Sequence, residues 1–191
     1  QSRGLGDVYK RQDQGGPNSY PGDYFNGDAP QKYKIKGSFG HPVPVVDGRT
    51  QSSGGKAKGV VLQKEFTNEK DVFSIDYTSS YSTPNLDKLI RTFVYDRQGK
   101  GSFTVGDEFT AKTPIRFETA ITTRADWKVL DDTHLLLATD SEQMIVAIDA
   151  SGKVAFTSET IEVNSPAYTR IGIALKNQSK EGYIRLKMYT K

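Results

Sequence analysis

The sequence predicts an all-β protein, folded as an antiparallel two-sheet β-sandwich of about 11–12 strands. Three observations support this fold class. Val, Ile, Thr and the aromatic residues, which favour strands, outnumber Ala, Leu and Met by more than two to one. Short segments of alternating apolar and polar residues recur along the chain, each closed by turn residues. The sequence has no helical pattern long enough to connect two parallel strands, which favours antiparallel pairing.

The first thirty residues carry little strand character. Residues 1–12 have no periodicity and are interpreted as a scar or disordered tail, so one domain is expected over residues 13–191. Residues 13–30 are rich in Gly, Pro, Asn and Tyr, which is typical of a loop. Beyond this loop, the alternation predicts strands over residues 32–36, 43–46, 58–66, 73–78, 89–96, 103–106, 115–122, 135–139, 144–148, 154–162, 171–175 and 184–188.

The residues between these segments predict how some strands connect. The sequence Gln98–Gly101 predicts a tight hairpin, and Gly106 is expected to form a β-bulge in the strand that follows. The turn Asp149–Gly152 separates two strands by the spacing of an antiparallel pair. A single helical turn is expected to start near Pro84 and to include Asn85–Lys88.

The composition excludes several classes of protein. The 191 residues include no Cys, so a disulfide framework, a zinc ribbon and a thiol nucleophile are excluded. No apolar run approaches the roughly 20 residues of a membrane-spanning helix. The formal net charge is only +3, with the basic residues mixed among 23 acidic ones, so nucleic acid is not an expected partner.

His41 has the most unusual setting of the two histidines. Gly40 leaves the backbone before the imidazole uncrowded, while Pro42 and Pro44 fix φ at about −65° and stiffen the path after it. An imidazole mounted in this way suits proton transfer or charge neutralisation, because its pKa lies near neutral. The spacing alone leaves an alternative open, in which His41 merely caps local hydrogen bonds at the start of a strand.

The other polar candidates point to structural roles. His134 lies beside Asp131 and Asp132, at the entrance to an apolar strand. The two histidines are too far apart in sequence to suggest a zinc site. Asp107 and Glu108 are expected to be solvated turn residues and not calcium ligands. Adjacent residues of a strand point to opposite faces, so Asp131 and Asp132 cannot serve as a glycosidase acid–base pair.

Four aromatic residues gather upstream of His41, namely Tyr20, Tyr24, Phe25 and Tyr33. Aromatic faces near Lys and Arg suit an anionic sugar chain, through stacking and charge. The same rings can simply pin a long loop onto the sandwich. The sequence favours neither interpretation over the other.

Several stretches together resemble one known family. The stretch GSFGHPVPVVDGRTQ, residues 37–51, resembles the start of the C-terminal β-sandwich domain of heparinase II/III-like polysaccharide lyases. The resemblance continues over Ser74–Phe109, Phe117–Asp132 and Thr169–Lys176, and more loosely over Asp13–Phe25. It covers nearly everything after residue 12.

The resemblance implies an activity and a set of site residues. In this family an α/α toroid precedes the sandwich, and glycans that contain uronic acid, heparan sulfate-like or alginate-like, bind in the cleft between them. Cleavage is by β-elimination. The histidine of the sandwich motif, here His41, reaches into the cleft as a catalytic residue, while the toroid supplies a Tyr and another His or Asn. Arg49 and Gln51, in the same motif, are expected to bind carbohydrate.

The resemblance also sets expectations about partners and location. A toroid does not fit in 191 residues, so the chain is expected to be a fragment of a longer bacterial enzyme, periplasmic or secreted, and inactive alone. Pro42, Val43 and Pro44 stand where some relatives carry a second, zinc-binding His, so we expect neither a metal nor another cofactor. Surface left by the missing toroid, near residues 13–30 and around Phe39, is expected to promote self-association.

A second hypothesis comes from a different class of function. The chain can be a stand-alone carbohydrate-binding or interaction module that keeps the sandwich without the chemistry. The reading frame upstream of Asp13 discriminates between the two hypotheses. Several hundred mostly helical residues there favour the lyase, whereas a start codon and a signal peptide favour the module.

Overall fold

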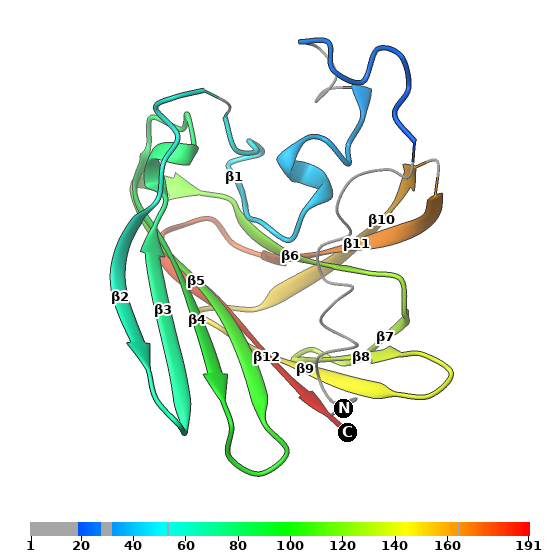
Figure 1. Ribbon diagram of the computed structural model, residues 1–191. Coiled ribbons are helices and arrows are strands. Elements are labelled where there is room, and N and C mark those ends of the chain that lie inside the picture. The colour runs from blue at the N-terminus through cyan, green and yellow to red at the C-terminus, as the bar shows by residue number, and fades with distance from the viewer. Residues whose placement is uncertain (1–18, 28–31, 53, 164) are drawn as a thin grey trace.

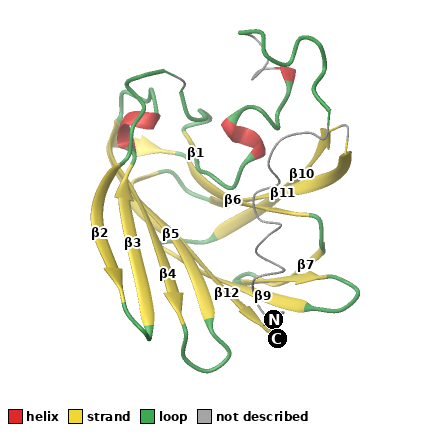
Figure 2. Ribbon diagram, in the orientation of Figure 1, coloured by secondary structure: helices red, strands yellow, loops and turns green. Residues whose placement is uncertain are grey.

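The computed structural model describes residues 19–27, 32–52, 54–163 and 165–191. Within these ranges, twelve strands form two antiparallel sheets that enclose a common core (Figures 1 and 2). Two short 3-10 helices, η1 (Ser38–Gly40) and η2 (Thr78–Ser80), interrupt the connections. The arrangement confirms the predicted all-β sandwich. No helix in the described ranges has the length and apolar character needed to cross a bilayer.

The larger sheet has eight strands. In spatial order they are β2 (Val60–Phe66), β3 (Lys70–Asp76), β4 (Leu86–Asp96), β5 (Ser102–Ile115), β12 (Ser179–Thr190), β9 (Gln143–Ala150), β8 (His134–Ala138) and β7 (Asp126–Asp131). β2 to β5 follow one another as neighbouring antiparallel strands. The predicted hairpin joins β4 to β5, and its Gly99 and Gly101 adopt the positive φ that favours glycine, 59° and 79°. β12 lies in the middle, between β5 and β9.

The smaller sheet has four strands, in the order β1 (Val45–Val46), β6 (Phe117–Thr123), β11 (Ser165–Leu175) and β10 (Val154–Val163). The chain passes from one sheet to the other after β1, β5, β6, β9 and β11. The antiparallel pair predicted across Asp149–Gly152 is therefore wrong, because β9 and β10 lie in different sheets. Ser151 N donates to Tyr183 O of β12 at 3.0 Å where the chain leaves the larger sheet. Turn spacing cannot distinguish such a crossing from a hairpin.

The core lies between the two sheets. Phe109 of β5 and Phe117 of β6 stack across it, with ring centroids 4.5 Å apart. Leu89 and Leu186 from the larger sheet and Ile171 from the smaller sheet are almost fully buried. Burial of each such side chain contributes about 1.5–3 kcal/mol, so this interface provides much of the stability of the sandwich.

A second apolar cluster covers the outer face of the smaller sheet. Ile161 of β10 and Tyr168 of β11 contact Tyr24 and Ile35 of the N-terminal segment. Figure 1 shows this segment in blue beside β10 and β11. The cluster packs the segment that leads to His41 onto the sheet.

The structure corrects two expected elements near the chain's first half. Residues 32–36 do not form a strand, and residues 34–36 form a turn in which Lys36 N donates to Tyr33 O at 2.9 Å. No helical turn follows Pro84, because Leu86–Lys88 already belong to β4. Both segments mix apolar and polar side chains, the first because it packs on a sheet and the second because it is an exposed strand end. Such a mixture does not distinguish a strand from a turn, so both predictions were wrong.

Gly106 and β7 also differ from expectation. Gly106 pairs regularly with Thr92 on one side and Arg185 on the other, so the predicted bulge is wrong. A Cβ at this position would lie 3.1 Å from Arg185 Cγ, and glycine instead leaves room for that side chain. β7 escaped prediction because most of its residues are exposed and it lacks a buried alternating face.

Candidate active site

His41 follows directly on η1, and its backbone is extended, with φ −113° and ψ 162°. The preceding Gly40 packs against the chain at Lys34, where a Cβ would approach the Lys34 carbonyl oxygen to 2.3 Å. Glycine is therefore required by this close approach. The half-buried imidazole of His41 places Nε2 3.0 Å from Ile35 O. Because a carbonyl only accepts, Nε2 carries the hydrogen of this bond.

Three buried side chains hold the backbone on both sides of His41. Tyr168 OH donates to Gly40 O, Arg91 Nη1 donates to Pro42 O, and Tyr81 OH donates to Pro44 O, each at 2.7 Å. These donors come from both sheets and from the connection after η2. The backbone carbonyls of residues 40, 42 and 44 are thus fixed to the sandwich, while the prolines restrict φ between them. The rigid mounting that the sequence suggested for His41 is present.

The Arg91 side chain belongs to a buried polar cluster. Asp107 accepts from Arg91 Nε and Nη2, both at 2.8 Å, and also from Tyr77 OH and Thr119 Oγ1, both at 2.7 Å. Burial raises the pKa of the Tyr77 hydroxyl well above its ordinary value, so Tyr77 stays a donor. Burial alone would lower the pKa of Arg91, but Asp107, Tyr77 and Tyr81 together outweigh it and the net pKa is raised. Asp107 is thus a structural ion-pair partner and not a solvated turn residue.

Gln51 is attached to the turn that precedes His41. Its backbone N donates to Ser38 Oγ of η1 at 2.9 Å. Gln51 also lines a cavity of about 320 Å³, together with Val43, Arg91 and the aromatic rings of β3 and β4. Phe73 and Phe93 lie across these strands with centroids 6.4 Å apart. The cavity next to the His41 segment therefore combines ring faces with polar groups, a composition that suits a sugar.

Arg49 is held by Val46 and Ser82. It closes a tight turn with Val46, in which Asp47 and Gly48 both have positive φ, 51° and 76°. Its exposed guanidinium donates to Ser82 O at 3.1 Å. The structure thus ties Gln51 to the His41 turn and ties Arg49 to the connection between η2 and β4.

The aromatic residues upstream of His41 divide into two groups. Tyr24 and Tyr33 pack in the second cluster, which supports the interpretation that they pin the segment. Tyr20 and Phe25 remain exposed, at 57% and 73%. Lys36 Nζ lies 5.4 Å from the Phe25 ring centroid. Exposed rings beside an ammonium group suit a glycan as well, so both interpretations find support in different residues.

The remaining candidates have structural surroundings. His134 Nδ1 lies 3.0 Å from Asp131 Oδ1 at the β7–β8 turn. Asp131 also accepts from Thr133 N, and this backbone bond, followed by His134, lowers the pKa of Asp131 to about 2. Among the described residues, no group of three or more His, Asp or Glu side chains is arranged to hold a metal ion.

Three residues that hold His41 escaped the sequence analysis, namely Tyr81, Arg91 and Tyr168. Arg91 left a visible signal, because it stands between Leu89 and Phe93 on the inward face of its strand. A charged residue at a core position implies a buried partner, but the partner, Asp107, lies in another strand. The two tyrosines resemble ordinary core residues in the sequence.

Comparison with known proteins gives a match at the level of structure. No protein-family model and no curated protein sequence matches the chain. A heparinase III structure superimposes with a TM-score of 0.65 at 18% identity, over 87% of this chain and 26% of that one. The heparan sulfate lyase HepC from Pedobacter heparinus gives 0.62 at 15% identity, over 79% of this chain and 24% of that one.

A second heparinase III structure gives a TM-score of 0.63 at 11% identity, over 94% of this chain. The chain spans about a quarter of the length of these proteins. These similarities show that the chain has the fold of one part of heparinase III and of heparan sulfate lyase. They agree with the sandwich fold that the family resemblance implied.

Proposed function

We propose that the chain is the β-sandwich portion of a polysaccharide lyase, acting on glycans that contain uronic acid. The observation that carries this proposal is the mounting of His41, whose flanking carbonyls are fixed by Tyr168, Arg91 and Tyr81. The sandwich that holds this imidazole shares its fold with heparinase III and a heparan sulfate lyase. A rigidly held imidazole suits proton transfer, because catalysis gains from fixed geometry.

The proposed reaction is a β-elimination. A base removes the proton on C5 of the uronate, and the electron pair of that C–H bond forms a C4–C5 double bond. The bond between C4 and the glycosidic oxygen breaks, and an acid protonates the leaving oxygen. His41 is the acid–base residue that this chain contributes. Gln51, beside the cavity, and Arg49 are the residues proposed to orient the sugar.

The proposal requires a second domain. One imidazole cannot at once remove the proton, protonate the leaving group and neutralise the carboxylate. The coverage of about a quarter of the lyase chains supports a larger enzyme, in which an α/α toroid supplies the other groups. A periplasmic or secreted location follows from the proposal, since the acidic polysaccharide is too large to reach an enzyme inside the cell.

The first prediction tests His41 in the full-length enzyme. His41→Ala is expected to lower kcat by about 10²- to 10⁴-fold, the usual contribution of a proton-transfer group. Its Tm should change little, because the ring is half-buried and little apolar area is lost. His134→Ala removes the other histidine, at the β7–β8 turn, and serves as the matched control with unchanged kcat. A His41→Ala enzyme that loses stability but keeps its activity would contradict the assignment.

A stand-alone glycan-binding module is the second candidate, favoured by the exposed rings of Tyr20 and Phe25. It predicts that the Tyr20→Ala, Phe25→Ala double variant loses binding to acidic oligosaccharides while His41→Ala keeps it. Under the lyase proposal, His41→Ala in the full-length enzyme slows release of unsaturated product by about 10²- to 10⁴-fold. The two measurements therefore separate a binding surface from a catalytic group.

A further inference from the structure

Two lysines lie side by side at one end of the smaller sheet. Val154 pairs with Leu175 in the β10–β11 ladder, and just beyond this pair Lys176 N donates to Lys153 O at 2.8 Å. Both lysines are exposed, and neither forms an ion pair with any residue that the structure describes. Like charges at opposite positions of a ladder repel each other. An anion between the two ammonium groups would relieve this repulsion.

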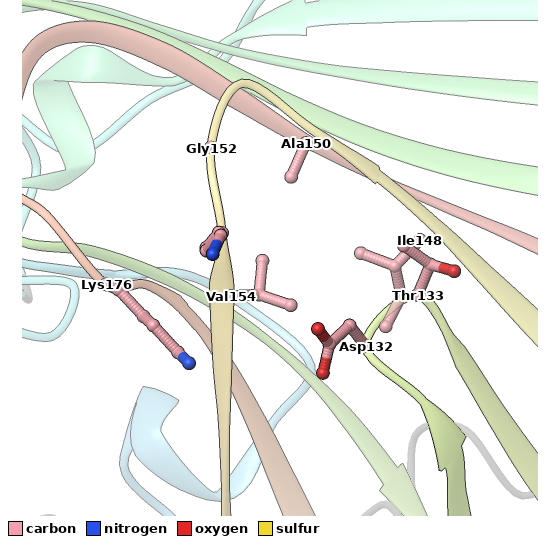
Figure 3. Close-up of a pocket in the computed structure, with 8 residues that line it drawn as sticks. Asp132, Thr133, Ile148, Ala150, Gly152, Val154 and Lys176 are labelled. Atoms are coloured by element: carbon pink, nitrogen blue, oxygen red, sulfur yellow. The ribbon is translucent and has the colours of Figure 1, made fainter.

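A cavity opens beside the two lysines, with a volume of about 310 Å³. Ile148, Ala150 and Val154 give it an apolar lining, where the chain passes from β9 to β10. In Figure 3, Val154 lies between Lys176 on one side and Asp132 on the other. The cavity thus combines an apolar wall, which suits the face of a pyranose ring, with two cations at its edge.

A second cavity of about 250 Å³ shares Lys176 with the first one. Its lining includes Arg116, whose side chain is 70% exposed and forms a long ion pair with Asp47, with 3.8 Å between Nε and Oδ1. Glu118 also lines this cavity, but its carboxylate is occupied by Arg170 Nη1 at 2.7 Å. Lys176 therefore lines both cavities. The first cavity has Lys153 as its other cation, and the second has Arg116.

We propose that Lys153 and Lys176 form a second binding site for an acidic glycan, separate from His41. The two ammonium groups hold one sulfate or carboxylate group, the attached ring lies against Val154, and Arg116 holds an anionic group of a neighbouring sugar. The two cations suit any polyanion, and we choose a glycan because the inference rests on the proposed function. The cavity at the lysine pair comes from the β7–β8 turn, β9, β10 and the end of β11, and includes none of the residues that hold His41. The site anchors the polymer outside the reacting position.

The test measures binding of a size-defined heparin octasaccharide and of an oligogalacturonate to this chain, by calorimetry at low ionic strength. The double variant Lys153→Gln, Lys176→Gln is expected to weaken binding of at least one probe by about tenfold. The control double variant Lys128→Gln, Lys187→Gln removes two exposed lysines from β7 and β12 and should change affinity by less than about twofold. Asp132→Asn, which removes the carboxylate at the cavity edge, should tighten binding. Equal losses in the two double variants, or no binding of either probe, would overturn the proposal.

A stability measurement provides an independent readout. Lys176→Gln relieves the repulsion with Lys153, so its Tm at low salt should exceed that of the unchanged chain, and the difference should shrink in high salt. A lower Tm at low salt would contradict the charge argument. All these measurements are made equally well in the His41→Ala background. Failure of this site leaves the His41 experiment intact, and failure of the catalytic proposal leaves glycan binding here measurable.

Discussion

Arg91 links the buried core to the loop that carries His41. Its guanidinium donates through Nε and Nη2 to Asp107 and through Nη1 to Pro42 O. This use of three nitrogens in fixed directions requires the planar fork of arginine, and lysine offers no equivalent. The residue therefore serves the stability of the sandwich and the position of the imidazole at once.

The second prediction concerns this ion pair. Asp107→Ala leaves the Arg91 charge buried without its carboxylate and is expected to lower the free energy of unfolding by about 3–5 kcal/mol. Asp71→Ala is the matched control, because Asp71 of β3 pairs with Arg97, just after β4, at the surface, where water already solvates the charges. Urea unfolding of both variants makes the comparison. Similar losses in the two variants would show that burial does not set the strength of the Arg91–Asp107 pair.

At the β7–β8 turn, an ionised carboxylate is likewise stabilised by its neighbours, but here it is exposed to solvent. Asp131 accepts from Thr133 N at 2.7 Å and lies beside His134, which together lower the pKa of its carboxyl to about 2 from the ordinary 3.8. Because the folded-state pKa is the lower one, the ionised carboxylate stabilises the turn fully above about pH 4. That contribution falls as the pH approaches 2.

The third prediction follows from the lowered pKa of Asp131. The amide resonance of Thr133 should titrate with a midpoint near 2, and Asp131→Asn should lower Tm at pH 7 and lower it much less at pH 2. Asp140→Asn removes another exposed carboxylate, in the next turn, and should show no such pH-dependent loss. A Thr133 midpoint close to 3.8 would disprove the role assigned to Asp131.

At the level of elements, the sequence predicted the strands that have one buried face. The alternation of Leu89, Arg91 and Phe93 located β4, and the glycines after Gln98 located its hairpin. β7 was missed because its side chains lie in solvent and leave no alternating pattern. The pairing of β9 with β12 was missed because the partners are separated by two other strands, and turn spacing carries no information about which sheet a strand enters.

Only part of the candidate site could be predicted from the sequence, because only part of it lies in one continuous stretch. His41 and Gln51 belong to one continuous stretch, so a local motif could place both of them. Tyr168 lies 128 positions from the carbonyl of Gly40 that it binds, a separation at which no local pattern exists. His41, the proposed reacting group, could therefore be located from the sequence, whereas the residues that hold it required the fold.

The fourth prediction applies to the whole molecule. This 191-residue chain is expected to fold but to release no unsaturated uronate from heparan sulfate or alginate, because His41 alone cannot provide the base, the acid and the carboxylate neutralisation. Absorbance near 232 nm reports the product. Product formed by this chain alone, and abolished by His41→Ala, would show that no toroid is needed.

The fifth prediction is self-association at high protein concentration. The surface expected to promote it includes residues 13–30, of which residues 19–27 are described and present Tyr20 and Phe25 to solvent. Phe39, also expected there, instead packs against Arg170, with 4.3 Å between the guanidinium carbon and the ring centroid. Sedimentation at millimolar concentration should reveal dimers that Phe25→Ser weakens. A purely monomeric profile would count against this interface.

The position of β12 determines when the larger sheet can be completed during synthesis. β12 pairs with β5 on one side and β9 on the other, although it follows both in the chain. Until residues 179–190 have left the ribosome, β2–β5 and β7–β9 are two half-sheets, each with an unpaired inner edge. Such edges are templates for wrong pairing between nascent chains. The last strand of this sheet to be translated is therefore the one that covers both edges, and shielding by a chaperone is most useful just before it emerges.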